Sequence, residues 1–256
     1  MVVDAHVHVG RWEDPAYSGR NLSLSETVSE LKRSGVKACY FFPTDSKDNE
    51  TLLSEFKKFD PGKEGFEAYF FPWVDLEKKD FMEFIERERR WISGLKFHPS
   101  YAGKPVTDSA YTPFFEFSRE NAFPVIIHCG RWREVSGFSF ALERARQLPE
   151  LSFVLSHMGG DMPQLQTAAI RDVVSQKLQN VLFGTESIRE YWNLEKGIRE
   201  LGANRFLFGS DFSLGHPSIY MSVIELCSMT EQEKSLILGK NALRLVTSSR
   251  CRCQFG

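Results

Sequence analysis

Apolar runs of strand length alternate with amphipathic segments of helix length along the whole chain. The apolar runs are rich in valine, isoleucine, leucine and phenylalanine, and many end at glycine or proline. Strands are predicted at residues 2–9, 36–43, 66–74, 93–99, 123–130, 151–160, 180–187 and 204–212. Helices are predicted at residues 25–34, 48–59, 79–91, 110–121, 138–147, 163–178, 191–201, 219–227 and 231–246.

Eight successive strand–helix units indicate an α/β fold, and their number and length favour a (β/α)8 TIM barrel over an open sheet. No linker composition interrupts the pattern, so residues 1–247 are predicted to form a single barrel domain. Residues 248–256 are expected to be a flexible C-terminal tail. No glycine-rich dinucleotide or nucleotide-triphosphate motif follows any predicted strand.

The composition narrows the classes of partner. A net charge of −2 shows no basic excess, so we expect no binding to nucleic acid or to anionic membranes. No apolar run approaches the roughly 20 residues of a membrane span, and no secretory leader opens the chain. Five cysteines without disulfide spacing fit a reducing compartment. The expectation is a cytoplasmic protein that acts on a small molecule, with a homo-oligomer left open.

The first predicted strand, VVDAHVHVG, combines an apolar face with a polar one. Side chains alternate along a strand, so Asp4, His6 and His8 are predicted to share one face. The opposite face then carries Val3, Ala5, Val7 and Val9. Two histidines placed two residues apart on one face can bind the same ion. The polar face is therefore predicted to be functional.

Polar side chains also recur at the carboxyl ends of other predicted strands. Five of the six histidines and one aspartate occupy such ends: His6, His8, His98, His128, His157 and Asp211. In a barrel these ends converge on one mouth, where active sites of this fold lie. Neutral imidazoles with a carboxylate suit Zn²⁺ and also accept Mn²⁺, Fe²⁺ or Co²⁺. A divalent metal centre is predicted, with zinc as the first expectation.

Six motifs, in the order DAHVHVG, GLKFHP, PVIIHCG, LSHMGG, LFGSDF and ILGKNALRLV, resemble the amidohydrolase superfamily and its amidohydrolase-2 branch. The resemblance implies that His6, His8 and His128 are metal ligands. It also implies that Asp211 binds the ion or takes a proton from its water, and that His157 is an acid/base group. One ion is favoured. With two ions, His157 and a carboxylated Lys96 would join the ligands.

The remaining candidates are substrate contacts. Arg11 and Arg131 directly follow ligand-bearing strands and can grip a carboxylate, while His98 and Glu186 are placed at the rim. The leading hypothesis is a metal-dependent hydrolase of an amide, lactone or ester. The alternative is a non-oxidative decarboxylase of an aromatic or related carboxylate. A phosphodiesterase resembling TatD-type DNases is disfavoured because PWVDL replaces their GETGLD-like element, and a non-catalytic binding module is the last alternative.

Overall fold

The computed structural model describes residues 1–130 and 133–253, and all eight predicted strands are present within them. They are β1 (Val2–Val9), β2 (Val36–Pro43), β3 (Glu67–Phe70), β4 (Leu95–Phe97), β5 (Val125–Ile127), β6 (Phe153–Leu155), β7 (Val181–Gly184) and β8 (Phe206–Leu207). From β3 onward the strands are shorter than predicted. The predicted ranges continued into the loops beyond the strands, where the apolar pattern does not separate strand from loop.

The strands run parallel in chain order and close into a barrel, which confirms the predicted fold class. They form one sheet in the order β1-β2-β3 and a second sheet in the order β4-β5-β6-β7-β8. The first seam joins β3 to β4, where Ser93 N donates to Phe70 O at 2.8 Å. The second seam joins β8 to β1, where Ala5 N donates to Phe208 O at 2.8 Å. These bonds complete the ring of strands.

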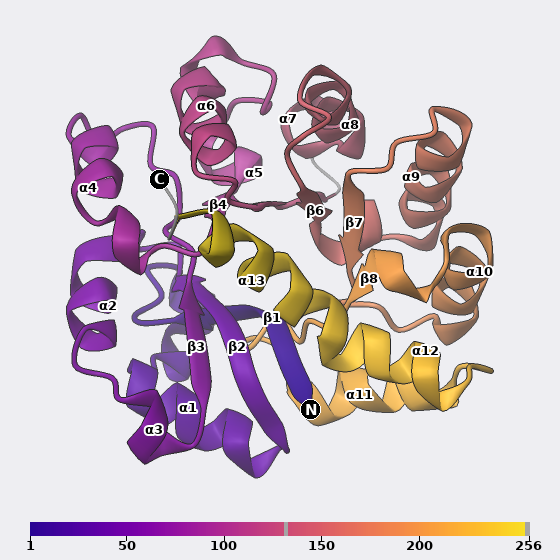
Figure 1. The fold of residues 1–256 in the computed structure, drawn as a ribbon, viewed down its shortest axis with the longest axis horizontal. Coiled ribbons are helices and arrows are strands. Elements are labelled where there is room, and N and C mark those ends of the chain that lie inside the picture. Colours follow the sequence, from indigo (N-terminus) through magenta and orange to yellow (C-terminus); the bar gives the residue numbers. More distant parts are fainter. Residues whose placement is uncertain (131–132, 254–256) are drawn as a thin grey trace.

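Helices surround the strands on the outside (Figure 1). The α-helices are α1 (Leu24–Arg33), α2 (Asn49–Phe56), α3 (Pro61–Glu64), α4 (Phe81–Arg87), α5 (Pro99–Ala102), α6 (Thr112–Glu120), α7 (Arg133–Ser136), α8 (Phe138–Gln147), α9 (Pro163–Ser175), α10 (Tyr191–Leu201), α11 (Pro217–Leu226), α12 (Glu231–Ser235) and α13 (Asn241–Cys253). Short 3-10 turns supplement them, including η1 (Pro15–Arg20) after β1. None of these helices is long and apolar enough to cross a bilayer.

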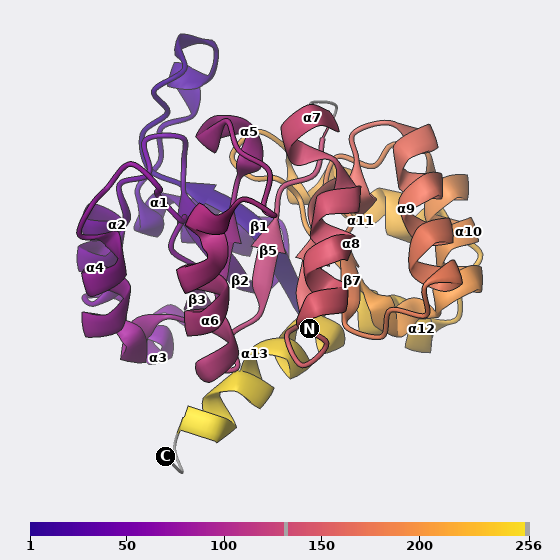
Figure 2. The same cartoon turned by 90° about the horizontal axis from the view of Figure 1, so that it is seen from above.

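The last predicted helix is divided in the structure. Helix α12 passes into a π-helical turn at Leu236–Lys240, and α13 then continues to Cys253. Figure 2 shows α13 beneath the barrel, at the end opposite to α5 and α7. Ala242 and Val246 of α13 belong to the apolar cluster inside the barrel, which includes Tyr40 and Phe71. The lower end of the barrel is thus plugged by apolar side chains, and the site can only open at the other end.

The first strand contains a β-bulge. Asp4 is in register with Cys39 of β2, and Val7 is in register with Phe41, so three steps along β1 match two steps along β2. One extra residue in a strand reverses the direction in which all later side chains point. The bulge therefore divides β1 into two halves whose alternation is out of phase.

The predicted face of Asp4 is corrected by this bulge. Val3 and Ala5 lie in the cluster inside the barrel, as does Phe42, the register partner of His8. The ring of His6 also packs edge-on against Phe42, with 4.8 Å between ring centroids. Val3, Ala5, His6 and His8 thus all face inward, and Asp4 does not share their face. Strict alternation cannot reveal the extra residue, because the bulge arises from pairing with a second strand.

Asp4 holds the bulge in place. Its Oδ1 accepts the backbone N–H of His6 at 3.1 Å and that of Ser210 at 3.0 Å, and its Oδ2 accepts the Ser210 hydroxyl. The carboxyl is fully buried, and burial raises its pKa to about 7. A buried polar side chain with three hydrogen bonds therefore links the strand that carries both histidines to the loop after β8.

Candidate active site

A cavity of about 670 Å³ opens at the carboxyl ends of the strands. His8, His98, His128, His157 and Asp211 all contribute to its lining. The aromatic part of the wall consists of Trp12, Tyr17, Trp73 and Tyr101. The structure therefore gathers most of the polar residues that were predicted at the strand ends into one cavity.

Three side chains form a group that can hold a metal ion. His6, His8 and Asp211 each present a ligand atom within 4.8 Å of the other two. Asp211 Oδ1 lies 3.4 Å from His6 Nε2 and 3.4 Å from His8 Nε2. Tetrahedral ligands at zinc bond lengths of about 2.1 Å are separated by about 3.4 Å. Both distances from Asp211 Oδ1 thus match the separation of two ligands on one first-row divalent ion.

The remaining ring nitrogen of each histidine has an acceptor. His6 Nδ1 lies 2.9 Å from Glu186 Oε1, and His8 Nδ1 lies 3.2 Å from the carbonyl oxygen of Pro43. An acceptor at Nδ1 keeps the proton on that nitrogen and leaves the Nε2 lone pair for a metal, as is usual for histidine ligands. The spacing of the ligand atoms and the tautomers of the two histidines are therefore both suited to a divalent metal ion.

The electrostatics of the site favour metal-binding protonation states. Burial, with the nearby Lys96, lowers the pKa of His6 to about 4, so its imidazole is neutral at neutral pH. Burial acts to raise the pKa of Asp211, but the hydrogen bond with His8 and the nearby His6 outweigh it and hold that pKa well below the ordinary range. A neutral imidazole and an ionised carboxylate are the forms that ligate a cation.

Lys96 is fully buried beside His6. Its Nζ lies 3.3 Å from His6 Nε2, 3.4 Å from Ser156 Oγ and 4.7 Å from the centroid of the Phe42 ring. Burial lowers the pKa of this amine to about 8. The amine thus lies beside one of the predicted metal ligands, while its carboxylation in a site with two ions stays a prediction.

His128 lies outside the three-residue group. Its Nδ1 is 3.2 Å from His157 Nε2, so one of these nitrogens donates to the other. Its ring stacks on His98 with 3.8 Å between centroids, and His98 stacks on Trp73 at 4.8 Å. The structure therefore places His128 in a second polar pair with His157, and its role as a metal ligand stays a prediction.

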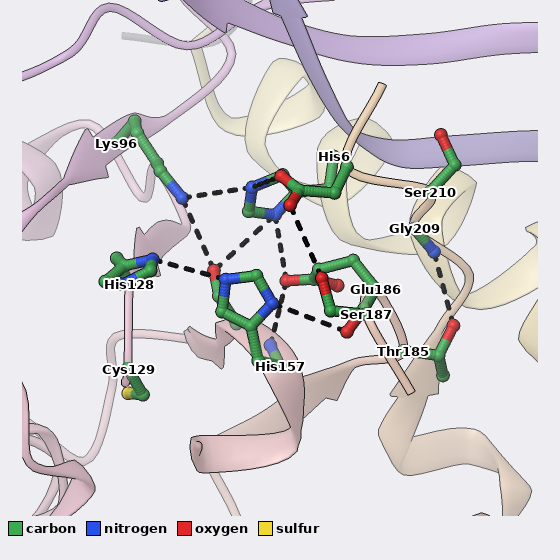
Figure 3. A network of polar contacts seen from close by, with 12 residues as sticks. His6, Lys96, His128, Cys129, His157, Thr185, Glu186, Ser187, Gly209 and Ser210 are labelled. Carbon is green, nitrogen blue, oxygen red and sulfur yellow. Dashed lines mark hydrogen bonds and ion pairs between the residues drawn. The ribbon is translucent and has the colours of Figure 1, made fainter. Parts of the chain in front are cut away.

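Glu186 lies beneath the cavity and does not line it. Its side chain is 1% exposed, and Oε1 also accepts the backbone N–H of His157 at 3.0 Å. Figure 3 shows this carboxylate between His6 and His157. Although burial acts in the opposite direction, the contact with His6 lowers the pKa of Glu186. The carboxylate contacts two site histidines here, and its expected contact with substrate stays a prediction.

The predicted arginines are not part of the described cavity wall. The Arg11 side chain is 76% exposed, with its Nε 3.9 Å from Glu13 Oε1. Arg131 lies outside the described residues. Sequence reasoning missed further polar wall residues, among them Asp14, Ser100, Tyr101, Asp161 and Ser187. Each lies a few residues beyond a strand, and this position was the one signal that could have found them.

The loop after β1 is fastened over one side of the cavity. Trp12 Nε1 donates to Ser213 Oγ at 3.0 Å, which ties this loop to the loop after β8. Asp45 accepts the backbone N–H groups of Glu13 at 2.7 Å and Asp14 at 3.0 Å. The indole of Trp12 is thereby held 5.1 Å from the ring of His8. An aromatic wall thus stands directly beside the metal-binding group.

The chain shares its fold with solved enzyme structures. It is similar to an amidohydrolase from Burkholderia multivorans, with TM-score 0.76 and 15% identity over 96% of this chain and 99% of that one. It is similar to 5-carboxyvanillate decarboxylase from Sphingomonas paucimobilis, with TM-score 0.73 and 14% identity over 96% and 98%. It is similar to 2,6-dihydroxybenzoate decarboxylase from Rhizobium, with TM-score 0.73 and 14% identity over 96% and 98%.

No curated protein sequence matches the chain significantly. Residues 66–247, however, match the sequence model of the amidohydrolase family. This range runs from the start of β3 into α13 and includes His98, His128, His157 and Asp211. The match therefore spans most of the barrel and most of the predicted site residues. The chain belongs to the amidohydrolase family, in its amidohydrolase-2 branch.

Proposed function

We propose that this chain is a metal-dependent hydrolase of small molecules, with one divalent ion held by His6, His8 and Asp211. The observation that carries the proposal is the orientation of Asp211. One carboxylate oxygen, Oδ1, lies between the two imidazole Nε2 atoms, and Oδ2 lies 3.4 Å from the hydroxyl of Ser187. The carboxylate thus has one oxygen for an ion and a second that can take a proton.

The reaction divides between the ion and the residues of the chain. When bound, the ion supplies Lewis acidity towards a carbonyl group. Asp211 Oδ2 accepts the proton of the attacking water, and His157 is the group that donates a proton to the leaving atom. The position of His157 supports this assignment. Its Nε2 contacts His128 Nδ1 at the cavity wall, so a proton can be exchanged between the two imidazoles. Zinc is our first expectation for the metal.

A second candidate, non-oxidative decarboxylation of an aromatic carboxylate, is favoured by a different observation. The rings of Trp73, His98 and His128 form a continuous stack in the cavity wall, with interplanar angles of 6° and 11°. Flat walls of this kind suit a flat substrate. Two of the similar structures are decarboxylases of aromatic carboxylates. In this reaction His157 would donate its proton to the carbon that loses CO2.

Manganese is the alternative metal. A similar 5-carboxyvanillate decarboxylase from Novosphingobium aromaticivorans was solved with manganese, and the Burkholderia multivorans amidohydrolase with zinc. Elemental analysis of protein purified without added metal or chelator decides between them. One equivalent of metal per chain supports the centre proposed here. A chain that holds none and takes up none on titration overturns both candidate functions.

The reaction itself is tested on lactones, esters and amides and on hydroxybenzoates, with the metal-loaded protein in ¹⁸O-labelled water. Hydrolysis incorporates ¹⁸O into the acid product and releases no CO2. Decarboxylation releases CO2, and in deuterated water it leaves deuterium on the ring carbon. Asp211→Asn is the control that should abolish either activity. Release of CO2 with no ¹⁸O-labelled acid product refutes the hydrolase proposal and supports the decarboxylase.

A further inference from the structure

We propose that Glu186 is a positioning residue, which ties the metal-binding nitrogen of His6 to the position of His157 through one carboxylate oxygen. Oε1 lies 2.9 Å from His6 Nδ1 and 3.0 Å from the backbone nitrogen of His157. Both partners are N–H donors in this arrangement. A single acceptor therefore sets the tautomer of one histidine and the backbone of the other (Figure 3).

The carboxylate sits in a seat made by two glycines. A Cβ atom on Gly184 would lie 2.2 Å from Glu186 Oε2, and one on Gly209 would lie 2.7 Å from the same oxygen. Any side chain at either position would push the carboxylate out of place. Neither glycine has a positive φ, so backbone conformation does not demand glycine at these positions. The close approach of the carboxylate does.

Burial of the Glu186 carboxylate destabilises the folded state, which argues that this side chain has a function in the site. Glu186 Oε2 is buried and has no hydrogen-bond partner among the described residues. An unsatisfied buried oxygen destabilises the folded state, so such an atom in a native fold calls for an explanation. Orientation of His6 and His157 by the other oxygen provides that explanation.

The backbone of His157 is strained, so contacts with other residues are needed to stabilise its conformation. It adopts the left-handed region with φ 56° and ψ 33°, and Met158 after it has φ 52°. This region is unfavourable for side chains other than glycine. Glu186 supplies two acceptors here, since its carbonyl oxygen also lies 3.4 Å from His157 Nδ1. The glutamate thus contacts both the backbone and the imidazole of His157.

The two metal-binding histidines differ in how they are oriented. His8 is fixed by the carbonyl oxygen of Pro43, which no side-chain substitution removes. His6 Nδ1 is oriented by side chains, and Glu186 Oε1 at 2.9 Å is a closer partner than Ser156 Oγ at 3.5 Å. Replacing Glu186 should therefore weaken metal binding through His6 alone. It should also release His157. The inference rests on the proposed metal site for the first effect and stands without it for the second.

The test compares Glu186→Ala and Gly184→Ala with wild type. Gly184→Ala leaves the glutamate in the chain but fills its seat. Glu200→Gln, a change in charge on the exposed face of α10, is the matched control. Metal dissociation constants are measured by titrating metal-free protein in competition with a chelator. Both test variants should bind metal about 10- to 100-fold more weakly, as for other carboxylates that orient histidine ligands.

The second readout needs no metal. Imidazole ¹⁵N shifts of metal-free protein should show His6 protonated on Nδ1 in wild type and a tautomer mixture in Glu186→Ala. Glu186→Gln retains an acceptor oxygen and should give an intermediate result. Unchanged metal affinity and an unchanged His6 tautomer in folded Glu186→Ala overturn the inference. If wild type binds no metal, the proposed function fails, and the tautomer measurement still decides the positioning role.

Discussion

Replacement of Asp4 by alanine should destabilise the protein without touching the cavity directly. The carboxylate accepts two backbone N–H groups, from His6 and Ser210, and one hydroxyl. Its side chain is 0% exposed, so the N–H groups that it accepts are shielded from bulk water. An unsatisfied buried donor costs about 1–3 kcal/mol. Because the serine hydroxyl can rotate to another partner, the two backbone donors set the expected loss at about 2–6 kcal/mol.

The assay is urea unfolding of metal-free protein, since bound metal would add its own binding free energy. Asp4→Asn is the control. Its amide oxygen can accept both backbone N–H groups and its NH2 group can donate to Ser210 Oγ, so this variant should keep the bulge. A loss of less than about 1 kcal/mol in Asp4→Ala would refute the reasoning. It would show that the bulge is held by strand pairing and not by the carboxylate.

Three further predictions concern the metal, the proton transfer and the pH dependence. His8→Ala should lower metal content in elemental analysis while the far-UV circular dichroism of the barrel persists; full metal occupancy would contradict its assignment as a ligand. His157→Asn should reduce kcat by about 10²- to 10⁴-fold with metal content intact, and loss of the ion instead would make His157 a ligand. Burial raises the pKa of Asp4 to about 7, so the unfolded chain releases this proton at lower pH than the folded one. As the pH rises from about 4 to 7, the free energy of unfolding of wild type should therefore fall relative to that of Asp4→Asn, by up to about 1.4 kcal/mol per pH unit. A difference that does not change with pH would contradict the raised pKa.

The positions of the strands and the gathering of site residues could be predicted because they depend on local patterns. The carboxyl ends of parallel strands meet at one mouth, so His6, His8 and Asp211 needed only correct strand assignments to be placed together. The barrel was predictable from the repeated strand–helix pattern, and the family from short motifs at the strand ends; both predictions are confirmed. Features set by the period and order of residues along the chain are visible without a structure.

The details that depend on distant partners were not predictable. The β1 bulge requires knowledge of how β1 pairs with β2, and the partner of Asp4 is 206 residues away. Glu186 was expected at the rim because the end of β7 reaches it. Its side chain instead turns beneath the cavity, into space left free by Gly184 at the end of β7 and Gly209 just after β8. Neither arrangement leaves a periodic signature in the sequence.

Closure of the barrel between β1 and β8 also determines when the proposed metal site can form. The two imidazole donors lie on the first strand, whereas Asp211 follows the last. During synthesis the nitrogen ligands emerge early and the carboxylate emerges near the end. Contacts between such distant residues form late because a long loop must be closed first. The proposed site therefore reaches its full affinity for an ion only after the last strand has docked, and a metal ion that meets the nascent chain earlier finds only the two histidines.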